Sequence, residues 1–359
     1  MTTRSLTPQP LRRLGVIMEP TLTDPREVEG VLNPAVTRGP DGALYLLPRL
    51  VGAGNYSRIG LARVCFTQGG DPAGVKRLDV VLEPREPYEL NRQSGGGVED
   101  ARVTYLALWR LYVMTYTAFG PAGPRDAAAI SRDLVQWRRT GLVLFAYEQG
   151  LDLARCDNKD ALLFPEPVAA PDGRPALALL HRPTFPTPPP ALRQAVRPAL
   201  RPSIWISYAP LEEIEAGQPI VFGQHHLLAG PQQRWEQLKI GGGTPPVRTH
   251  AGWLLLYHGV ARHRGPGASP PHAFTYRAGA MLLDSRDPRR VVYRTVRSIL
   301  GPRVATERVG VVPRVVFPTG LDVREDGTLD VYYGMADRCI GVARTTLPDL
   351  LRPAATLAA

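Results

Sequence analysis

Short apolar runs recur along the whole chain and set the first expectation for its fold. Runs of five to eight residues rich in Val, Ile, Leu, Tyr and Trp are bounded by Gly, Pro, Asp or Asn. This pattern is typical of β-strands separated by turns. Long segments with the apolar spacing of helices are nearly absent. We therefore predict an all-β fold.

Five loosely similar units follow one another, each with a polar or proline-containing start, a turn and a strand. They begin with the segments 33–49, 98–120, 160–183, 242–260 and 317–337. Their starts lie about 60 to 85 residues apart, a period that suits four-stranded blades. We predict a five-bladed β-propeller over residues 33–345, with residues 1–32 packing on it and 346–359 as a C-terminal tail. A pair of β-sandwiches is the structural alternative.

Composition narrows the class of protein. An apolar content of 44% in 359 residues is normal for a soluble protein with a sizeable core. No apolar run approaches the length of about 18 residues that a membrane span needs, and the first twenty residues lack the apolar core of a secretory signal. We expect a soluble, cytoplasmic protein without a membrane partner.

Cysteines and charge exclude two further classes. Cys65, Cys156 and Cys339 are odd in number and far apart, which argues against a disulfide framework and predicts buried small hydrophobes. The net charge of +10 invites a nucleic-acid interpretation, but no block of five or more basic residues is present. We expect no nucleic-acid partner. Lys159 and Lys239, two of the three lysines, lie inside motifs quoted below.

The stretch GGGVEDARV (95–103) places two acids and an arginine beside an apolar strand, where an unpaired charge is costly. A propeller explains this position, because the first strand of each blade lines a central channel. Many polar residues lie at a strand's entry or exit and could converge there. They are Arg49, Arg58, Glu99, Asp100, Arg102, Lys159, Asp160, Glu166, His181, Arg182, Tyr257, His258, Tyr276 and Asp337.

A set of short motifs occurs in a fixed order from about residue 33 to 345. They are SRIGLA (57–62), GVEDARVT (97–104), NKDALLFPE (158–166), ALLHRP (178–183), KIGGGTPPV (239–247), GWLLLYHGV (252–260), YRAGAMLLD (276–284) and VYYGMAD followed by IGVA (331–343). In this order the motifs resemble glycoside hydrolase family 130, the mannoside phosphorylases and related mannosidases, which are five-bladed propellers.

The resemblance implies inverting phosphorolysis, with Asp100 as the catalytic acid. The carboxylic acid protonates the 3-hydroxyl of the mannosyl unit, which passes its own proton to the glycosidic oxygen. Phosphate attacks the anomeric carbon from the opposite face and yields α-mannose 1-phosphate. Inorganic phosphate and a β-mannoside are the expected partners, and no metal or organic cofactor is expected, since the histidines lack metal-ligand spacing.

The donors for phosphate are expected at Lys159, Arg182, His258 and Tyr276, which match the family's phosphate-binding positions. An inverting hydrolase needs a second carboxylate about 6.5–9.5 Å from the first, whereas anionic phosphate needs a cationic site. Arginine can bind phosphate bidentately and lysine adds a point charge. The family usually has Arg or Lys where Lys159 stands, and its mannosidases have carboxylates in place of this set.

The remaining predicted contacts are to sugar. Arg49 and Arg58 are assigned to sugar hydroxyls, and Asp337 to the mannosyl unit as a hydrogen-bond acceptor. Glu99, Arg102 and Asp160 complete the substrate-binding set. For several positions a purely structural role is the alternative. Asp100 and Arg102 could form a structural ion pair, Arg182 could lie on the surface, and His258 could be a core histidine.

Two other functions stay open. One is hydrolysis, by a β-mannosidase of the same fold or another five-bladed hydrolase such as an arabinanase; the other is a non-catalytic propeller that binds glycans or proteins. The acceptor sugar is not revealed, because the loops 183–202 and 261–275, which we expect to form its subsite, are rich in Pro, Gly or Arg. The sequence is compatible with a homo-oligomer and does not fix the oligomeric state.

Overall fold

The structure, a computed structural model, is described for residues 11–91, 95–148, 150–185, 201–215, 219–263 and 274–351. In this part of the chain regular structure is nearly all β-strand and the helices span five residues or fewer. None of the helices described is long and apolar enough to cross a membrane. The all-β prediction is confirmed.

The strands form antiparallel groups of four. The first group contains β2 (Gly30–Arg38), β3 (Leu44–Gly52), β4 (Tyr56–Phe66) and β5 (Pro72–Leu82). The second contains β6 (Gly96–Leu106), β7 (Leu111–Gly120), β8 (Gly123–Ser131) and β9 (Arg138–Leu142). A short parallel contact between β4 and β6 joins these two groups into one sheet of eight strands.

The next two groups repeat this order. The third contains β11 (Asp157–Leu163), β13 (Pro175–Thr184), β14 (Ile204–Pro210) and β15 (Val221–Ala229), extended by β10 (Leu144–Phe145) and β12 (Val168–Ala169). The fourth contains β16 (Lys239–Gly242), β18 (Gly252–Arg262), β19 (Phe274–Leu283) and β20 (Val291–Arg294), with β17 (Val247–Thr249) beside β18. The short helices are η1 (Ala107–Trp109), α1 (Leu211–Glu215), η4 (Arg234–Glu236), α2 (Ala305–Arg308) and α3 (Leu347–Leu350).

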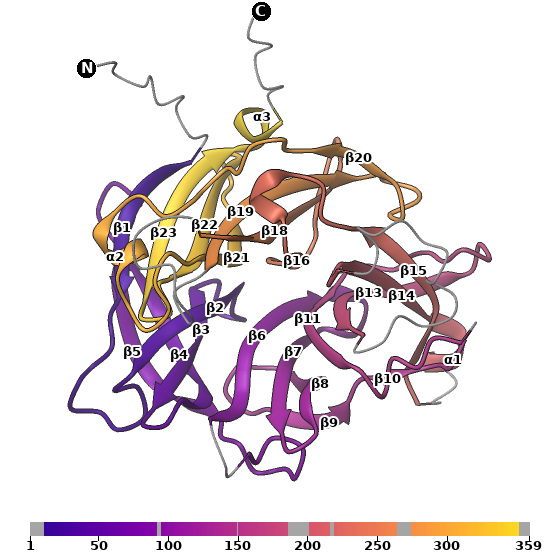
Figure 1. The fold of residues 1–359 in the computed structure, drawn as a ribbon, viewed down its shortest axis with the longest axis horizontal. Coiled ribbons are helices and arrows are strands. Elements are labelled where there is room, and N and C mark those ends of the chain that lie inside the picture. The colour runs from indigo at the N-terminus through magenta and orange to yellow at the C-terminus, as the bar shows by residue number, and fades with distance from the viewer. Residues whose placement is uncertain are drawn as a thin grey trace, which may run out of the picture.

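The fifth group joins the two ends of the described chain. It combines β21 (Val316–Val323), β22 (Thr328–Met335) and β23 (Cys339–Thr346) with β1 (Arg12–Met18), which pairs antiparallel with β23. Figure 1 shows the groups side by side around the centre of the molecule, in chain order. Each predicted unit starts within the first strand of a group. The predicted domain boundaries stay a prediction.

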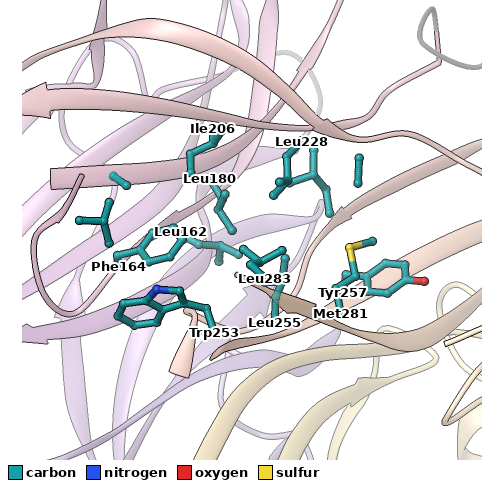
Figure 2. Close-up of a cluster of buried hydrophobic side chains, with 14 of the residues drawn as sticks. Leu162, Phe164, Leu180, Ile206, Leu228, Trp253, Leu255, Tyr257, Met281 and Leu283 are labelled. Atoms are coloured by element: carbon teal, nitrogen blue, oxygen red, sulfur yellow. The ribbon is translucent and has the colours of Figure 1, made fainter. Parts of the chain in front are cut away.

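Apolar cores lie between neighbouring groups. Leu162, Leu180 and Ile206 of the third group pack with Trp253 and Leu255 of the fourth (Figure 2). Equivalent clusters join the other neighbouring pairs, including the fifth group with the first. A sheet that is packed on both faces carries apolar side chains on both faces. This explains why the strand sequences are continuous apolar runs. Each large side chain buried there contributes roughly 1.5–3 kcal/mol.

A buried glutamate links the inner and outer strands of a group, an arrangement that we call the glutamate clasp. In the second group Glu89 precedes the first strand and is fully buried. Its Oε1 accepts hydrogen bonds from the Tyr116 hydroxyl of β7 at 2.7 Å and from Arg139 Nε of β9 at 2.8 Å. Its Oε2 accepts from the backbone amides of Arg85 and Glu86. The clasp therefore neutralises a buried carboxylate and fixes the turn that enters the group.

The same clasp recurs twice among the described residues. Its members are Glu236, Tyr257 and Arg294 in the fourth group, and Glu307, Tyr333 and Arg13 in the fifth. Tyr257, which the sequence placed among the candidates for the channel, thus belongs to a clasp and does not line the cavity described below. His181, another candidate, is buried and hydrogen-bonds to Ser207 and Asn158 inside the third group.

The cysteines only partly match expectation. Cys156 and Cys339 are buried and unpaired, as predicted, but Cys65 is exposed. The prediction for Cys65 was wrong. Near the end of β4 side chains alternate between the core and solvent, and Cys65 lies on the solvent side.

Candidate functional site

The site is built on a bulge that repeats in three first strands. In β6, Glu99 pairs with Thr117 and Arg102 with Thr115, so Asp100 and Ala101 together oppose one residue of β7. The same two-against-one pairing occurs in β2 and β11. The first residue of each bulge is Asn33, Asp100 or Asp160, with φ of 45°, 47° and 61°. All three line one cavity.

The backbone explains why these positions carry Asn or Asp. A positive φ is uncommon for residues other than glycine, and Asn and Asp tolerate it best. A bulge also changes the direction of its side chain relative to the strand. The sequence signal is a dipeptide inside each unit, Asn33-Pro34, Asp100-Ala101 and Asp160-Ala161, and it identifies Asn33, which we had not predicted.

The cavity has a volume of about 340 Å³ and is lined by strands of all five groups within the described chain. Eight of the eleven predicted site residues line it: Arg49, Asp100, Lys159, Asp160, Arg182, His258, Tyr276 and Asp337. The lining residues that we had not predicted are Asn33, Pro124, Asp157, Thr184, Lys239, Val312, Val315 and Phe317. The fold thus brings together residues from distant parts of the chain.

Three predicted residues do not line the cavity. Arg58 is bound to Glu83 at 2.9 Å and to the Arg26 carbonyl at 2.9 Å. Glu99 and Arg102 are buried directly behind the cavity wall, with exposed fractions of 3% and 1%. Their placement indicates support of the site rather than direct contact with a sugar. The predicted acceptor loops fall mostly on residues 186–200 and 264–273, which lie outside the described residues.

Asp100 is held by neighbours on two other strands. Its Oδ1 accepts hydrogen bonds from Asn33 Nδ2 at 2.8 Å and Arg49 Nη1 at 3.3 Å. Burial acts to raise the pKa of Asp100, but Arg49, Arg102, Lys159 and the Asn33 hydrogen bond together lower it below its ordinary value. Without ligand the carboxyl is therefore ionised at neutral pH.

Glu99 and Arg102 fix the surroundings of Asp100. Glu99 accepts from Arg49 Nη2 at 2.9 Å and from Lys159 Nζ at 3.2 Å, so one carboxylate orients two cavity cations. Arg102 donates to the Asp100 carbonyl at 2.7 Å and to the carbonyl of Gly243. The predicted Asp100–Arg102 relationship is thus a contact to the backbone of Asp100.

A second part of the cavity lining, which we call the cationic wall, contains Lys159, Arg182, Lys239, His258 and Tyr276. It is organised by Asp160. Its Oδ2 accepts from Arg182 Nε at 2.6 Å and lies 3.8 Å from His258 Nε2. Burial acts to raise the pKa of Asp160, but Arg182, His258 and Arg102 hold it well below its ordinary value. Burial lowers the pKa of His258 to about 3, so its imidazole is neutral. Asp160 therefore orients the predicted phosphate donors and keeps Arg182 charged.

Two lysines and a tyrosine complete that wall. Lys159 Nζ lies 5.4 Å from the Phe119 ring centroid, and Lys239 Nζ lies 5.4 Å from that of Tyr276. Burial, with the charge of Arg182, lowers the pKa of Lys239 to about 7. Burial raises the pKa of Tyr276 to about 12. The wall thus presents cations and a neutral hydroxyl donor.

Gly241 allows these groups to pack together. A Cβ atom at this position would lie 2.1 Å from Asp160 Oδ2, 2.4 Å from His258 Cε1 and 2.8 Å from Arg182 Nε. By sequence, the glycine runs 95–97 and 241–243 are expected to be loops that allow close backbone approach. The close approach is present at Gly241, but residues 96–97 belong to β6 and 241–242 to β16, so these residues are not loops.

The described residues contain no group of three or more His, Cys, Asp or Glu placed to hold a metal ion. The cavity lining carries a carboxylate, Asp100, together with the cations Lys159, Arg182 and Lys239. This arrangement suits an acid beside a bound anion.

Comparisons with known proteins cover nearly the whole chain. The family model described as beta-1,4-mannooligosaccharide phosphorylase matches residues 7–353. The chain is 30% identical over 347 residues to the 1,2-beta-oligomannan phosphorylase of Thermoanaerobacter sp. (strain X514), covering 95% of this chain and 98% of that protein. It is 31% identical over 265 residues to the beta-1,2-mannobiose phosphorylase of Listeria innocua serovar 6a, covering 74% of this chain and 62% of the relative.

A solved structure is similar in fold. The beta-1,2-mannobiose phosphorylase from Listeria innocua, in complex with beta-1,2-mannobiose, superposes with a TM-score of 0.71 at 25% identity. The match covers 93% of this chain and 96% of that one.

Proposed function

Because the chain belongs to glycoside hydrolase family 130, we propose that it is a β-mannoside phosphorylase. It cleaves a β-mannoside with inorganic phosphate and releases α-mannose 1-phosphate and the shortened sugar. The observation that carries this proposal is the cavity itself, in which Asp100 shares the lining with the cations Lys159, Arg182 and Lys239.

Phosphate binds at the cationic wall. Arg182 and Lys159 supply charge-assisted hydrogen bonds, which are stronger than neutral ones. His258 and Tyr276 add neutral donors, since neither ring changes charge between pH 5 and 9. Lys239 joins this predicted set because it lines the same cavity and packs on Tyr276. No metal or organic cofactor takes part in the proposed reaction.

Asp100 supplies the proton. Its carboxylic acid protonates the mannosyl 3-hydroxyl oxygen, and the proton of that hydroxyl passes to the glycosidic oxygen. The bond from the anomeric carbon to the glycosidic oxygen breaks while a phosphate oxygen bonds that carbon from the opposite face. Arg49 and Asp337 contact the mannosyl hydroxyls, and Asn33 orients the acid through its 2.8 Å hydrogen bond.

Phosphate also explains how Asp100 obtains its proton. In the free enzyme burial acts to raise the pKa of Asp100, but the nearby cations outweigh it and lower the pKa. A bound phosphate dianion neutralises Lys159 and adds negative charge near the carboxyl, and both effects raise a carboxyl pKa. The co-substrate therefore converts Asp100 into an acid.

Hydrolysis is the less well supported alternative. It needs an ionised carboxylate as base. The acidic side chains among the described lining residues are Asp100, Asp157, Asp160 and Asp337. Burial, opposed by Arg49 and reinforced by Asp100, raises the pKa of Asp337 to about 7. A pKa near 7 suits a general base, so phosphorolysis is favoured by the cationic lining and by the relatives named as phosphorylases rather than by the acidity of Asp337. Asp160 is engaged by Arg182 at 2.6 Å.

The substrate class is proposed from the relatives. The two relatives described above are named for β-1,2-linked mannosides, whereas the family model is named for β-1,4-linked ones. The relative that spans 95% of this chain acts on oligomannan by its name. We therefore place β-1,2-mannobiose and longer β-1,2-oligomannosides first among candidate substrates.

We also propose a five-bladed β-propeller as the architecture. Each group of four antiparallel strands corresponds to one blade, and pairing of β1 with β23 closes the ring. The support is the chain-order arrangement in Figure 1 and the core clusters between neighbouring groups.

The decisive experiment incubates the protein with β-1,2- and β-1,4-mannobiose and with 4-O-β-mannosylglucose, with and without phosphate. We expect α-mannose 1-phosphate only when phosphate is present, and the fastest release from a β-1,2-linked substrate. Equal release of free mannose in both buffers would instead identify a hydrolase. Binding of the sugars without turnover in either buffer would identify a non-catalytic glycan-binding protein.

A further inference from the structure

Asp126 is a buried carboxyl behind the cationic wall that the proposed reaction does not use. It lies on β8, which packs against β11, and its exposed fraction is 2%. Neither carboxylate oxygen has a hydrogen-bond partner of normal geometry among the residues that the structure describes. A carboxylate that loses water without gaining partners is strongly destabilised. Asp126 is therefore held as a neutral acid.

The groups that face Asp126 belong to the phosphate site. They are Lys159 and Asp160 of β11, Arg182 of β13, the backbone amide of Ala161 and the Cys156 thiol. Burial, with the charge of Asp160, raises the pKa of Asp126 to about 8 against the opposing effect of Arg182 and Lys159. Burial raises the pKa of Cys156 to about 12, so the thiol stays neutral.

We propose that Asp126 is a positioning residue of the phosphate site, uncharged when phosphate binds, whose ionisation weakens phosphate binding. Asp160 already uses one carboxylate to hold Arg182 at 2.6 Å. A second negative charge beside it would compete with phosphate for Arg182 and Lys159 and would repel the anion directly. The inference rests on the proposed function, because it assigns phosphate to this wall.

Linkage gives the direction of the effect. Phosphate binds better when Asp126 is neutral, so bound phosphate raises the pKa of Asp126 above its value of about 8 in the free enzyme. The Asp126 contribution to phosphate affinity is constant below that pH and falls above it, by at most tenfold per pH unit. Lys239 loses its charge over a lower range, near pH 7, and also weakens phosphate binding as pH rises.

The test compares the phosphate KM of wild type and Asp126→Asn from pH 6.5 to 9.5. The amide cannot ionise, while the contribution of Lys239 is common to both proteins and cancels in their ratio. We expect equal KM within twofold at pH 6.5 and a wild-type KM at least fivefold higher than that of the variant at pH 9.5. Asp79→Asn, at a side chain 80% exposed, is the control and should follow wild type. Parallel profiles for Asp126→Asn and wild type would overturn the proposal.

Thermal unfolding supplies a readout that does not depend on catalysis. The pKa of Asp126 is higher in the folded state than its ordinary 3.8, so its stabilising contribution is complete below about pH 4 and is lost as pH rises toward 8. Asp126→Asn should therefore melt at a higher temperature than wild type at pH 8, with a smaller difference at pH 5. An Asp126→Asn variant that melts below wild type at both pH 5 and pH 8 would overturn the proposal. If Asp126→Asn does not fold, the same measurements are made on Asp126→Ser, which also cannot ionise.

The outcomes also separate this inference from the proposed function. Calorimetric phosphate binding by both proteins is measured alongside turnover. If wild type forms no sugar phosphate, the proposed function fails, while the pH dependence of the phosphate Kd still decides the role of Asp126. If wild type forms sugar phosphate and the two pH profiles coincide, only the role of Asp126 fails.

Discussion

The side-chain amide of Asn33 donates a 2.8 Å hydrogen bond to Oδ1 of Asp100. Both residues are the first member of a bulge at positive φ, on the first strands of neighbouring groups. The relationship orients the proposed acid and holds one carboxylate oxygen, Oδ1, which also accepts from Arg49. It therefore links the geometry of one group to the chemistry of the next.

Replacing Asn33 should impair turnover without preventing phosphate binding. Asn33→Ala removes a hydrogen bond to a charged group, which is worth about 1.5–3 kcal/mol, and we expect kcat to fall at least tenfold. Asn33→Asp instead places a second negative charge beside Asp100 and raises its pKa. The pH profile of kcat should then extend to higher pH than in wild type. Unchanged kcat in both variants would remove Asn33 from the mechanism.

Asp100→Asn separates catalysis from binding. The amide keeps the shape of the side chain but carries no proton for the mannosyl 3-hydroxyl, so we expect turnover to fall at least a thousandfold. Phosphate affinity, measured by calorimetry, should rise rather than fall, since the cationic wall is intact and the ionised carboxylate that opposes the anion is gone. A variant that retains a tenth of wild-type turnover would show that another group is the acid.

Lys159→Ala and Arg182→Ala should raise the phosphate KM. Loss of one charge-assisted contact of about 1.5–3 kcal/mol corresponds to roughly ten- to hundredfold. Arg182→Ala should have the larger effect, because it also leaves Asp160 without its 2.6 Å partner. Mannoside KM serves as the internal comparison and should change less. If neither variant alters the phosphate dependence, the phosphate lies elsewhere.

Lys239 should make phosphate binding depend on pH near neutrality. Burial, with the charge of Arg182, lowers its pKa to about 7, so its positive charge is complete below that pH and is lost above it. Lys239→Met should raise the phosphate KM about tenfold or more at pH 6, for loss of a charge-assisted contact. The difference from wild type should narrow at pH 9. A constant ratio across this range would show that Lys239 does not titrate in the site.

The glutamate clasp should matter for stability rather than for phosphate. Glu89→Gln breaks a buried pair with Arg139, and we expect a loss of about 3 kcal/mol in the free energy of unfolding. Burial acts to raise the pKa of Glu89, but Arg139 and other donors lower it below 4.5. Its contribution is thus present above that pH and lost as pH falls. Asp172→Asn, in an exposed pair, should leave stability close to that of wild type, since solvent screens exposed ion pairs.

The strands and most of the site could be predicted from sequence, because apolar runs mark buried strands and ordered motifs mark the cavity-lining residues. Asn33 and Lys239 were not predicted as site residues, since neither follows from apolar periodicity. Their positions depend on the bulge in β2 and on how β16 enters the cavity.

Glu99 and Arg102 lie outside the cavity lining for a different reason. A strand alternates its side chains between two faces, and a single extra residue reverses that alternation. Sequence spacing alone could not reveal where the pairing of β6 skips a residue between Glu99 and Arg102. The clasp was also not predicted, because its Glu, Tyr and Arg are 23 to 50 positions apart in the second group.

The bulge in β2, β6 and β11 thus places one side chain of each strand in the cavity, and its residue type can differ from strand to strand. The same backbone position carries an amide in β2, the proposed acid in β6 and a counter-ion for arginine in β11. A single substitution at such a position alters the charge of the cavity while the sheet hydrogen bonds stay as they are. Divergence of reaction type within this architecture can therefore proceed one residue at a time, without a change of scaffold.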